Sequence, residues 1–209
     1  DNYALPDNCS SSFSIAKRTV TVSWSGGEFV YSKSEKTVSA TVTNVVDGDT
    51  VSLSYRTKSQ KTDWTSGNGA TRADSYTTEI IAVSDDNYSI DGATNLSLSW
   101  VINPKTVNSF EWELDDGTVY SVIYNGATHT LTASAVSGAT QDSDGKIYDG
   151  DTLTLTYSAS VINNYGISSI AVNSAVNAGE YRVIIADCGN TDYVPGDATQ
   201  DFTIERRTL

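Results

Sequence analysis

Methionine is absent from this 209-residue sequence, histidine occurs once, and cysteine occurs only as Cys9 and Cys188. Two cysteines are too few for a disulfide framework, and they lack the spacing of metal ligands. Basic residues are also scarce, because 13 Lys and Arg oppose 26 Asp and Glu, which gives a net charge of −13. Nucleic acids need a basic face, so the charge argues against a nucleic-acid partner. No apolar run approaches the ~20 residues of a membrane span, and we expect no membrane insertion in this fragment.

One short pattern occurs three times, at residues 13–20, 100–107 and 202–209. It consists of an aromatic residue, an Ile two positions later, a basic residue three positions after that, then Thr and an aliphatic residue. Three copies enclose two repeats, and such self-similarity indicates a repeat architecture. We therefore predict a tail of an upstream repeat over 1–12, a first repeat over 13–103 and a second over 104–209.

Each repeat is long enough to bury its own core, near the common domain size of about 100 to 150 residues. If each is a body about 35 Å across, an end-to-end arrangement holds Cys9 and Cys188 far beyond bridging distance. We therefore expect no intrachain disulfide unless the two repeats fold back on each other.

Period-two alternation of polar and apolar residues predicts β-strands throughout the chain. Residues 19–24 alternate in this way, and residues 47–55 match residues 149–157, where an Asp-Gly-Asp turn starts a strand. No segment holds apolar residues at helical spacing. We predict an all-β protein of two tandem Ig-like β-sandwich domains with roughly six or seven strands each. A nearly continuous strand with a very short linker, about 2 residues, would join them.

Several tyrosines keep their place in both repeats. The matching pairs are Tyr31 and Tyr124, Tyr55 and Tyr157, Tyr76 and Tyr181, and Tyr88 and Tyr193. Between them the second repeat carries two insertions, one within 114–120 and one at 138–147, which we expect to be loops.

The ordered motifs of the second repeat are those of a known family. Tyr148-Asp149-Gly150-Asp151 comes first, Asn177-Ala178-Gly179 precedes Tyr181, and Asp192-Tyr193 precedes the last junction. Together with the Ile-x-x-Lys/Arg-Thr-Val junction, this order resembles the MBG/YDG-type repeats found in tandem in large secreted bacterial adhesins and mucus-binding-type proteins.

The first repeat departs from that pattern. Val46 stands where Tyr148 stands, and Arg72 and Asp74 replace Asn177 and Gly179. The resemblance implies MBG domains of a bacterial surface protein, secreted or at the cell surface, that serve as a stalk or spacer in cell adhesion. It carries over no catalytic residue, so we expect no enzyme. The implied partners are neighbouring repeats of the same chain, with a host glycan or mucin as an alternative ligand, and we expect a monomer.

Candidate chemistry is sparse. The single histidine, His129, has no Gly-x-Ser-x-Gly elbow to work with, and we expect an ordinary surface residue. Asp pairs flank turn glycines in both repeats, which favours turn formation over glycoside hydrolysis. Lys17 and Lys105 lie beside the junctions and are expected to protect a sheet edge, although cross-linking of such a lysine to an asparagine is an alternative.

Two weaker ligand candidates remain. The acidic insertion begins like a calcium loop but lacks the distal ligands of an EF-hand. We expect no cofactor and favour a solvated acidic loop, with a weak Ca²⁺ site as the alternative. Its ligands would be Asp142, Asp144, Asp149 and Asp151. Residues 56–69 read as a long polar loop with Trp64 in its middle, and an exposed Trp is a candidate for sugar stacking.

Overall fold

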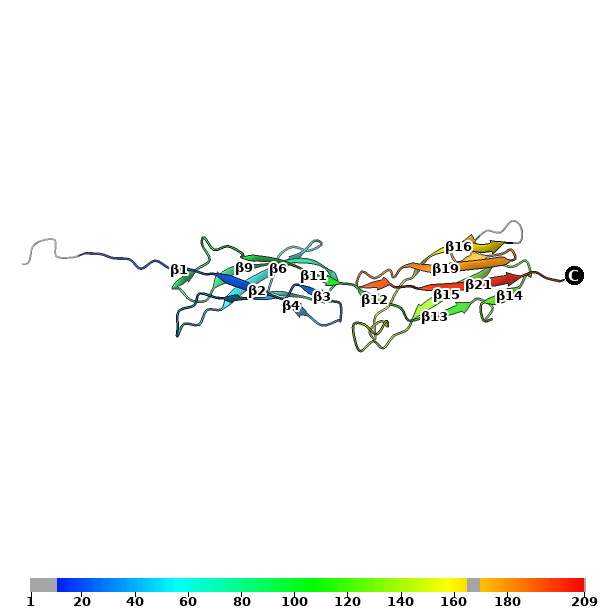
Figure 1. Cartoon of the computed structure of the whole chain (residues 1–209), viewed down its shortest axis with the longest axis horizontal. Coiled ribbons are helices and arrows are strands. Elements are labelled where there is room, and N and C mark those ends of the chain that lie inside the picture. The colour runs from blue at the N-terminus through cyan, green and yellow to red at the C-terminus, as the bar shows by residue number, and fades with distance from the viewer. Residues whose placement is uncertain (1–10, 165–169, 209) are drawn as a thin grey trace, which may run out of the picture. The chain divides into compact units, whose positions relative to one another are not determined.

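A computed structural model describes residues 11–164 and 170–208, and within these ranges the chain is all-β without a helix. The chain forms two compact units, coloured along the sequence in Figure 1. The first unit holds the described residues up to Gly27 together with Thr37–Asn68 and Thr77–Trp100. The second holds Glu28–Lys36, Gly69–Tyr76 and the described residues from Val101 onwards. Two segments from the first repeat in sequence therefore belong to the second compact unit.

The earlier half of the sequence contains eleven strands in short sheets. A five-stranded sheet has the order β3-β11-β9-β6-β7, and three two-stranded sheets pair β1 with β10, β2 with β5, and β4 with β8. The strands are β1 (Arg18–Thr19), β2 (Val22–Ser25), β3 (Glu28–Val30), β4 (Lys36–Thr37), β5 (Ser39–Val42), β6 (Leu53–Ser59), β7 (Thr65–Ser66), β8 (Gly69–Ala70), β9 (Asp74–Val83), β10 (Tyr88–Ser89) and β11 (Ser97–Asn103).

Two four-stranded sheets dominate the second unit, with the orders β14-β21-β19-β16 and β13-β15-β18-β17. A parallel pair, β12 with β20, completes it. The strands are β12 (Lys105–Val107), β13 (Phe110–Leu114), β14 (Ser121–Ile123), β15 (His129–Ala135), β16 (Thr156–Asn164), β17 (Ile170–Ala171), β18 (Ser174–Ala175), β19 (Gly179–Asp187), β20 (Tyr193–Pro195) and β21 (Thr199–Glu205).

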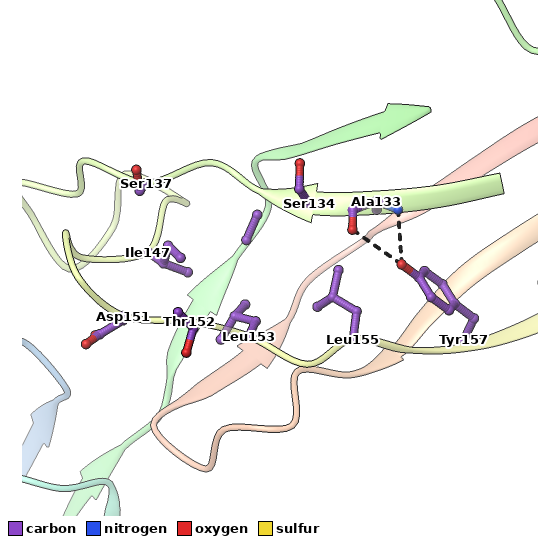
Figure 2. Close-up of a pocket in the computed structure, with 10 residues that line it drawn as sticks. Ala133, Ser134, Ser137, Ile147, Asp151, Thr152, Leu153, Leu155 and Tyr157 are labelled. Atoms are coloured by element: carbon purple, nitrogen blue, oxygen red, sulfur yellow. Dashed lines mark hydrogen bonds between the residues drawn. The ribbon is translucent and has the colours of Figure 1, made fainter. Parts of the chain in front are cut away.

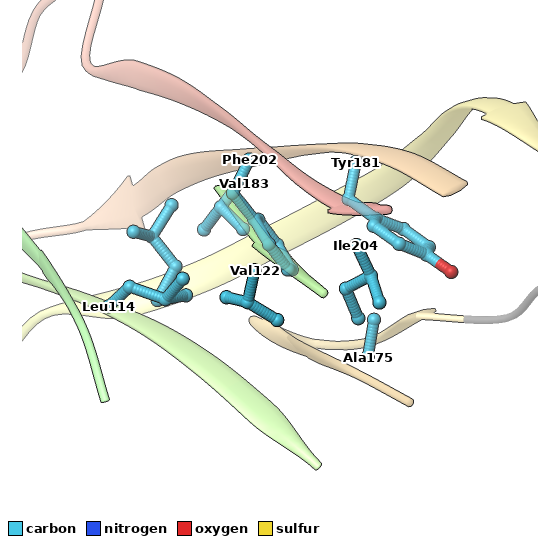
Figure 3. Packing of buried hydrophobic residues seen from close by; sticks show 8 residues of the cluster. Leu114, Val122, Ala175, Tyr181, Val183, Phe202 and Ile204 are labelled. Atoms are coloured by element: carbon cyan, nitrogen blue, oxygen red, sulfur yellow. The ribbon is translucent and has the colours of Figure 1, made fainter. Parts of the chain in front are cut away.

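The core of the second unit lies between these two sheets. Alternate residues of β19 and β21, such as Tyr181, Val183 and Phe202, point to the same side as period-two strands require. They share one buried cluster with Leu114 and Ala175 of the opposite sheet (Figure 3). Two sheets that bury one cluster between them make a sandwich-like layer pair. A smaller cluster fills the first unit, formed by Val20, Val22, Val42, Ile80 and Tyr88.

The strand pairing repeats along the sequence as the matching motifs predict. The parallel pair β1–β10 corresponds to β12–β20, and β3–β11 corresponds to β14–β21. The predicted short link is also present, since β11 ends at Asn103 and β12 begins at Lys105 with Pro104 between them. Pro donates no hydrogen bond, so it suits the break between two ladders. One expectation is wrong: Arg56–Ser59 is not loop but the end of β6, which pairs with β7.

No helix in the described residues is long and apolar enough to cross a membrane.

Candidate functional site

The tyrosine before each junction anchors the Asp-Gly-Asp turn of its own repeat. In the first unit the Tyr88 hydroxyl donates to Asp49 Oδ2 at 2.8 Å and accepts from the Val46 amide at 2.8 Å. In the second unit the Tyr193 hydroxyl donates to Asp151 Oδ2 at 2.5 Å and accepts at 3.0 Å from the amide of Tyr148, the residue equivalent to Val46. Two different turns are therefore tied to the sheet by the same pair of hydrogen bonds.

A second tyrosine pair fastens a strand to its neighbouring sheet in both repeats. The Tyr55 hydroxyl bonds to both the amide and the carbonyl of Ala40, each at 3.1 Å. The Tyr157 hydroxyl does the same at Ala133, at 3.0 and 3.3 Å, as the dashed lines in Figure 2 show. These tyrosines satisfy backbone groups that β5 and β15 would otherwise leave without a partner.

A third pair closes the turn ahead of the long central strands. The Tyr76 hydroxyl donates to the Arg72 carbonyl at 2.7 Å, and the Tyr181 hydroxyl donates to the Asn177 carbonyl at 2.5 Å. Three of the four recurring tyrosine pairs are thus structural in both repeats, with their hydroxyls hydrogen-bonded to the fold.

Tyr31 fills a site inside the second unit. Its ring packs edge-on against Tyr193 at 5.4 Å and Tyr148 at 6.1 Å, measured between ring centroids. Its hydroxyl donates to Asp151 at 3.3 Å, and only 4% of its surface is exposed. Burial and the nearby Asp151 carboxylate raise the pKa of Tyr31 to about 12.

Asp151 is the charged centre of this site. Lys33 forms an ion pair with it at 2.9 Å and also donates to the Asp149 carbonyl at 2.8 Å. Burial pushes the pKa of Asp151 upward, but the hydrogen bonds from Tyr193 and Lys33 outweigh it and hold the pKa below the usual range. Asp151 is therefore an anion that binds three side chains of its own unit.

Asp192 is a fully buried carboxylate beside the same site. Its Oδ1 accepts from the Ala73 amide at 2.8 Å, and its Oδ2 lies 2.9 Å from Arg72 Nε. The Arg72 contact lacks the direction of a hydrogen bond and acts as an ion pair. Asp192 thus orders the segment Gly69–Tyr76 within the second unit.

Lys105 lies in a cage that sequence reasoning missed. Its ammonium is buried and donates to the Gln141 and Asp142 carbonyls, each at 2.7 Å, and to Asp144 Oδ1 at 2.9 Å. The ring of Tyr148 lies 5.3 Å away. These acceptors stabilise the charged ammonium, and the hydrogen bond from Lys105 lowers the pKa of Asp144. The prediction of an edge-protecting surface lysine is wrong here, because the 138–147 insertion covers it.

The predicted calcium ligands lie in two separate settings. Asp144 pairs with Lys105, and the Asp142 carboxylate accepts from the Tyr148 hydroxyl at 2.7 Å. Asp151 belongs to the Tyr31 site, and Asp149 contributes its carbonyl to Lys33. Among the described residues, no group of three or more His, Cys, Asp or Glu side chains is arranged to hold a metal ion. The calcium site remains a prediction.

Trp64, the candidate for sugar stacking, follows β6 and precedes β7. Arg56 Cζ lies 4.3 Å and Lys58 Nζ 4.6 Å from the centroid of its ring, which is half-buried. Arg56 also pairs with Glu79 at 2.6 Å. The two cations lie over the Trp64 ring, where they can attract an anionic group, and a sugar that stacks on the same face would have to displace them.

His129 is buried, so the expectation of a surface histidine is wrong. Its Nδ1 lies 3.3 Å from Asp115, and its Nε2 lies 3.2 Å from Asn125 Oδ1. Both ring nitrogens therefore face side-chain oxygens, and neither contact brings in a nucleophile.

A pocket of about 370 Å³ lies beside β15 in the second unit (Figure 2). Its walls are mostly small or aliphatic, and its ionisable groups, Asp151 and Tyr157, are already hydrogen-bonded within the fold. The pocket offers no acid–base pair for catalysis.

Cys188 is a free, buried thiol whose pKa is raised to about 11 by burial and by Asp187. Cys9 lies outside the described residues, so the expectation for the cysteine pair stays a prediction.

No protein-family model matches this chain, and no curated protein matches it.

Proposed function

We propose that this chain is a pair of non-enzymatic, extracellular repeat domains of a bacterial cell-surface protein, acting as the stalk or spacer of an adhesin. The observation that carries the proposal is the identical use of three tyrosine pairs in both repeats. Tyr88 and Tyr193 hold the Asp-Gly-Asp turns, and the other pairs bond to backbone groups. Because the recurring tyrosines stabilise the fold of each repeat, they support a role of the chain as a spacer over a role in catalysis.

The acidic character of the chain supports the same proposal. A net charge of −13 makes copies of the chain repel one another at long range, which keeps a protein soluble at a crowded surface. A spacer must hold its ends apart, so small-angle scattering of the chain in solution should give an extended particle. A compact, folded-back particle would contradict the proposal.

A second candidate function is favoured by one observation, the Trp64 ring with Arg56 and Lys58 beside it. Aromatic rings stack on sugars, and adjacent cations suit acidic glycans such as those of mucins. The test is a glycan array with the chain and its Trp64→Ala variant, with Trp24→Phe as a matched control because Trp24 packs against the core. Specific binding that only Trp64→Ala abolishes would establish a glycan-binding module. Absence of binding by all three proteins would leave the spacer role alone, and equal binding by all three would show that Trp64 is not the glycan site.

A further inference from the structure

The first unit has a pocket at the place where the second unit holds Tyr31. This pocket, of about 380 Å³, is lined by the junction residues of the first repeat and by its turn. The lining residues are Ile15, Ala16, Lys17, Arg18, Val46, Asp49, Asp86, Asn87 and Tyr88.

In the second unit the equivalent residues contact Tyr31. Asp151 corresponds to Asp49, and Tyr193 corresponds to Tyr88, as their shared hydrogen bonds show. Tyr31 packs on Tyr193 and donates to Asp151. The pocket of the first unit is thus the same site, and no described residue occupies the place that Tyr31 takes in the second unit.

Exposure supports this comparison. Val46 is 49% exposed and Asn87 is exposed, whereas the equivalent Tyr148 is half-buried and Asp192 is fully buried. An apolar side chain and a buried tyrosine at the wall of an open pocket are suited to receive an aromatic ring.

The second repeat carries the matching tyrosine on its surface. Tyr124 is equivalent to Tyr31, and its amide donates to the Glu205 carbonyl at 2.8 Å, just as the Tyr31 amide donates to the Asn103 carbonyl at 2.9 Å. Two residues further on, Lys33 and Gly126 both have positive φ, 61° and 82°. The backbone that presents the tyrosine is therefore the same, yet Tyr124 is 38% exposed whereas Tyr31 is 4% exposed.

One ion pair beside the Tyr31 site is replaced by a neutral pair in the proposed contact. The ion pair of Arg72 with Asp192 borders the Tyr31 site. Asn177 stands at the position of Arg72, and Asn87 stands at the position of Asp192. Both partners are neutral amides, which can hydrogen-bond to each other. At this position neither half brings a charge to the other.

The Lys33–Asp151 ion pair has no counterpart, because Gly126 stands at the Lys33 position. The Asp49 carboxylate therefore gains no ion pair there and keeps its hydrogen bond from Tyr88.

We propose that Tyr124 and the pocket of the first unit are the two halves of a head-to-tail docking surface, in which Tyr124 of one copy of this chain fills the pocket of a second copy. The interface is heterologous, because different surfaces of the two copies meet, so it adds copies in an open row. This inference goes beyond the spacer role and rests only on contacts inside the two units.

The test uses two full-length variants that each keep one half of the surface. Tyr124→Ala keeps only the pocket, and Val46→Glu keeps only the tyrosine; both positions are exposed, so both variants should fold. ¹⁵N-labelled Tyr124→Ala is titrated with unlabelled Val46→Glu to about 2 mM, which reaches millimolar dissociation constants. We expect saturable shifts of the amide signals of Asp49, Asn87 and the labelled Val46.

Two controls make the outcome decisive. In the first control, unlabelled Tyr124→Ala is the added protein, and it should cause no shift. In the second control, the added Val46→Glu protein also carries Val119→Ala at an exposed position near Tyr124, and the shifts should persist. Absence of shifts with Val46→Glu would overturn the proposal. So would shifts of equal size from a donor without Tyr124, because another surface would then be responsible.

Discussion

Replacing Tyr31 by alanine should lower the free energy of unfolding strongly, whereas replacing Tyr124 should hardly change it, although the two residues are equivalent in the two repeats. Tyr31 is buried against two tyrosine rings, and removing a buried aromatic ring costs about 3–5 kcal/mol of unfolding free energy. The two edge-on pairs account for about 0.5–1.5 kcal/mol each of that cost. Tyr124 is exposed, and at micromolar concentration its loss should change stability by no more than about 0.5 kcal/mol.

The assay is urea unfolding followed by tryptophan fluorescence, with hydrogen exchange at β12 and β20 to locate the loss. Tyr31→Phe is the matched control, since it keeps the ring and removes only the 3.3 Å hydrogen bond to Asp151. We expect about 0.5–1.5 kcal/mol for this variant. Equal losses in Tyr31→Ala and Tyr124→Ala, or a loss below about 1 kcal/mol in Tyr31→Ala, would refute the reasoning.

The same site gives an alkaline signature. The pKa of Tyr31 is raised from 10.0 to about 12, so its hydroxyl binds the proton more tightly in the folded state. Its contribution to stability is complete below pH 10 and is lost as the pH rises from 10 to about 12. Tyr31→Phe should remove this part of the alkaline loss, which unfolding curves at pH 9 and pH 11 would measure.

Three further predictions concern single side chains. Tyr193→Phe should lower the free energy of unfolding by roughly 1.5–3 kcal/mol, which is more than Tyr88→Phe should. Asp151, the partner of Tyr193, is partly buried, whereas the carboxylate that accepts from Tyr88 is exposed and can bond to water instead. Urea unfolding of both variants compares them, and equal losses would count against that reason. Lys105→Met should cost roughly 1.5–3 kcal/mol and speed hydrogen exchange over 138–147, because three acceptors lose their donor; unchanged exchange there would disprove the cage. Cys188 should resist iodoacetamide at pH 8 in the folded chain and react in urea, since burial raises its pKa to about 11; rapid native labelling, followed by mass spectrometry, would contradict its burial.

Much of the fold could be predicted from local pattern. Period-two alternation placed strands correctly, for example at Val22–Ser25, because a half-buried strand must alternate. The matched tyrosines Tyr88 and Tyr193 could be paired by spacing alone, and the structure gives them the same partners. Local pattern works for these two tyrosines because the hydroxyl of each one bonds to the turn of its own repeat.

The candidate sites were harder to predict because they depend on contacts between distant parts of the sequence. Lys105 resembles any junction lysine until the 138–147 insertion folds over it. Its equivalent, Arg18, has no such insertion above it and stays exposed. The segments Glu28–Lys36 and Gly69–Tyr76 join the second unit through Tyr31 and Arg72, and no periodicity encodes that assignment. His129 was misplaced although it lies two residues before Leu131 and therefore shares the buried face of β15 with it, which the alternation of the strand could have shown.

The caged ammonium of Lys105 has a consequence for the medium in which the protein works. The acidic loop 138–147 resembles a cation-binding loop, and the ammonium group of Lys105 takes the place of the metal ion at its centre. Loops of this kind that rely on calcium lose their shape when the ion is diluted or chelated. A cation built into the chain is always present at full occupancy, so this loop keeps its conformation across changes in dissolved ions that would empty a metal site.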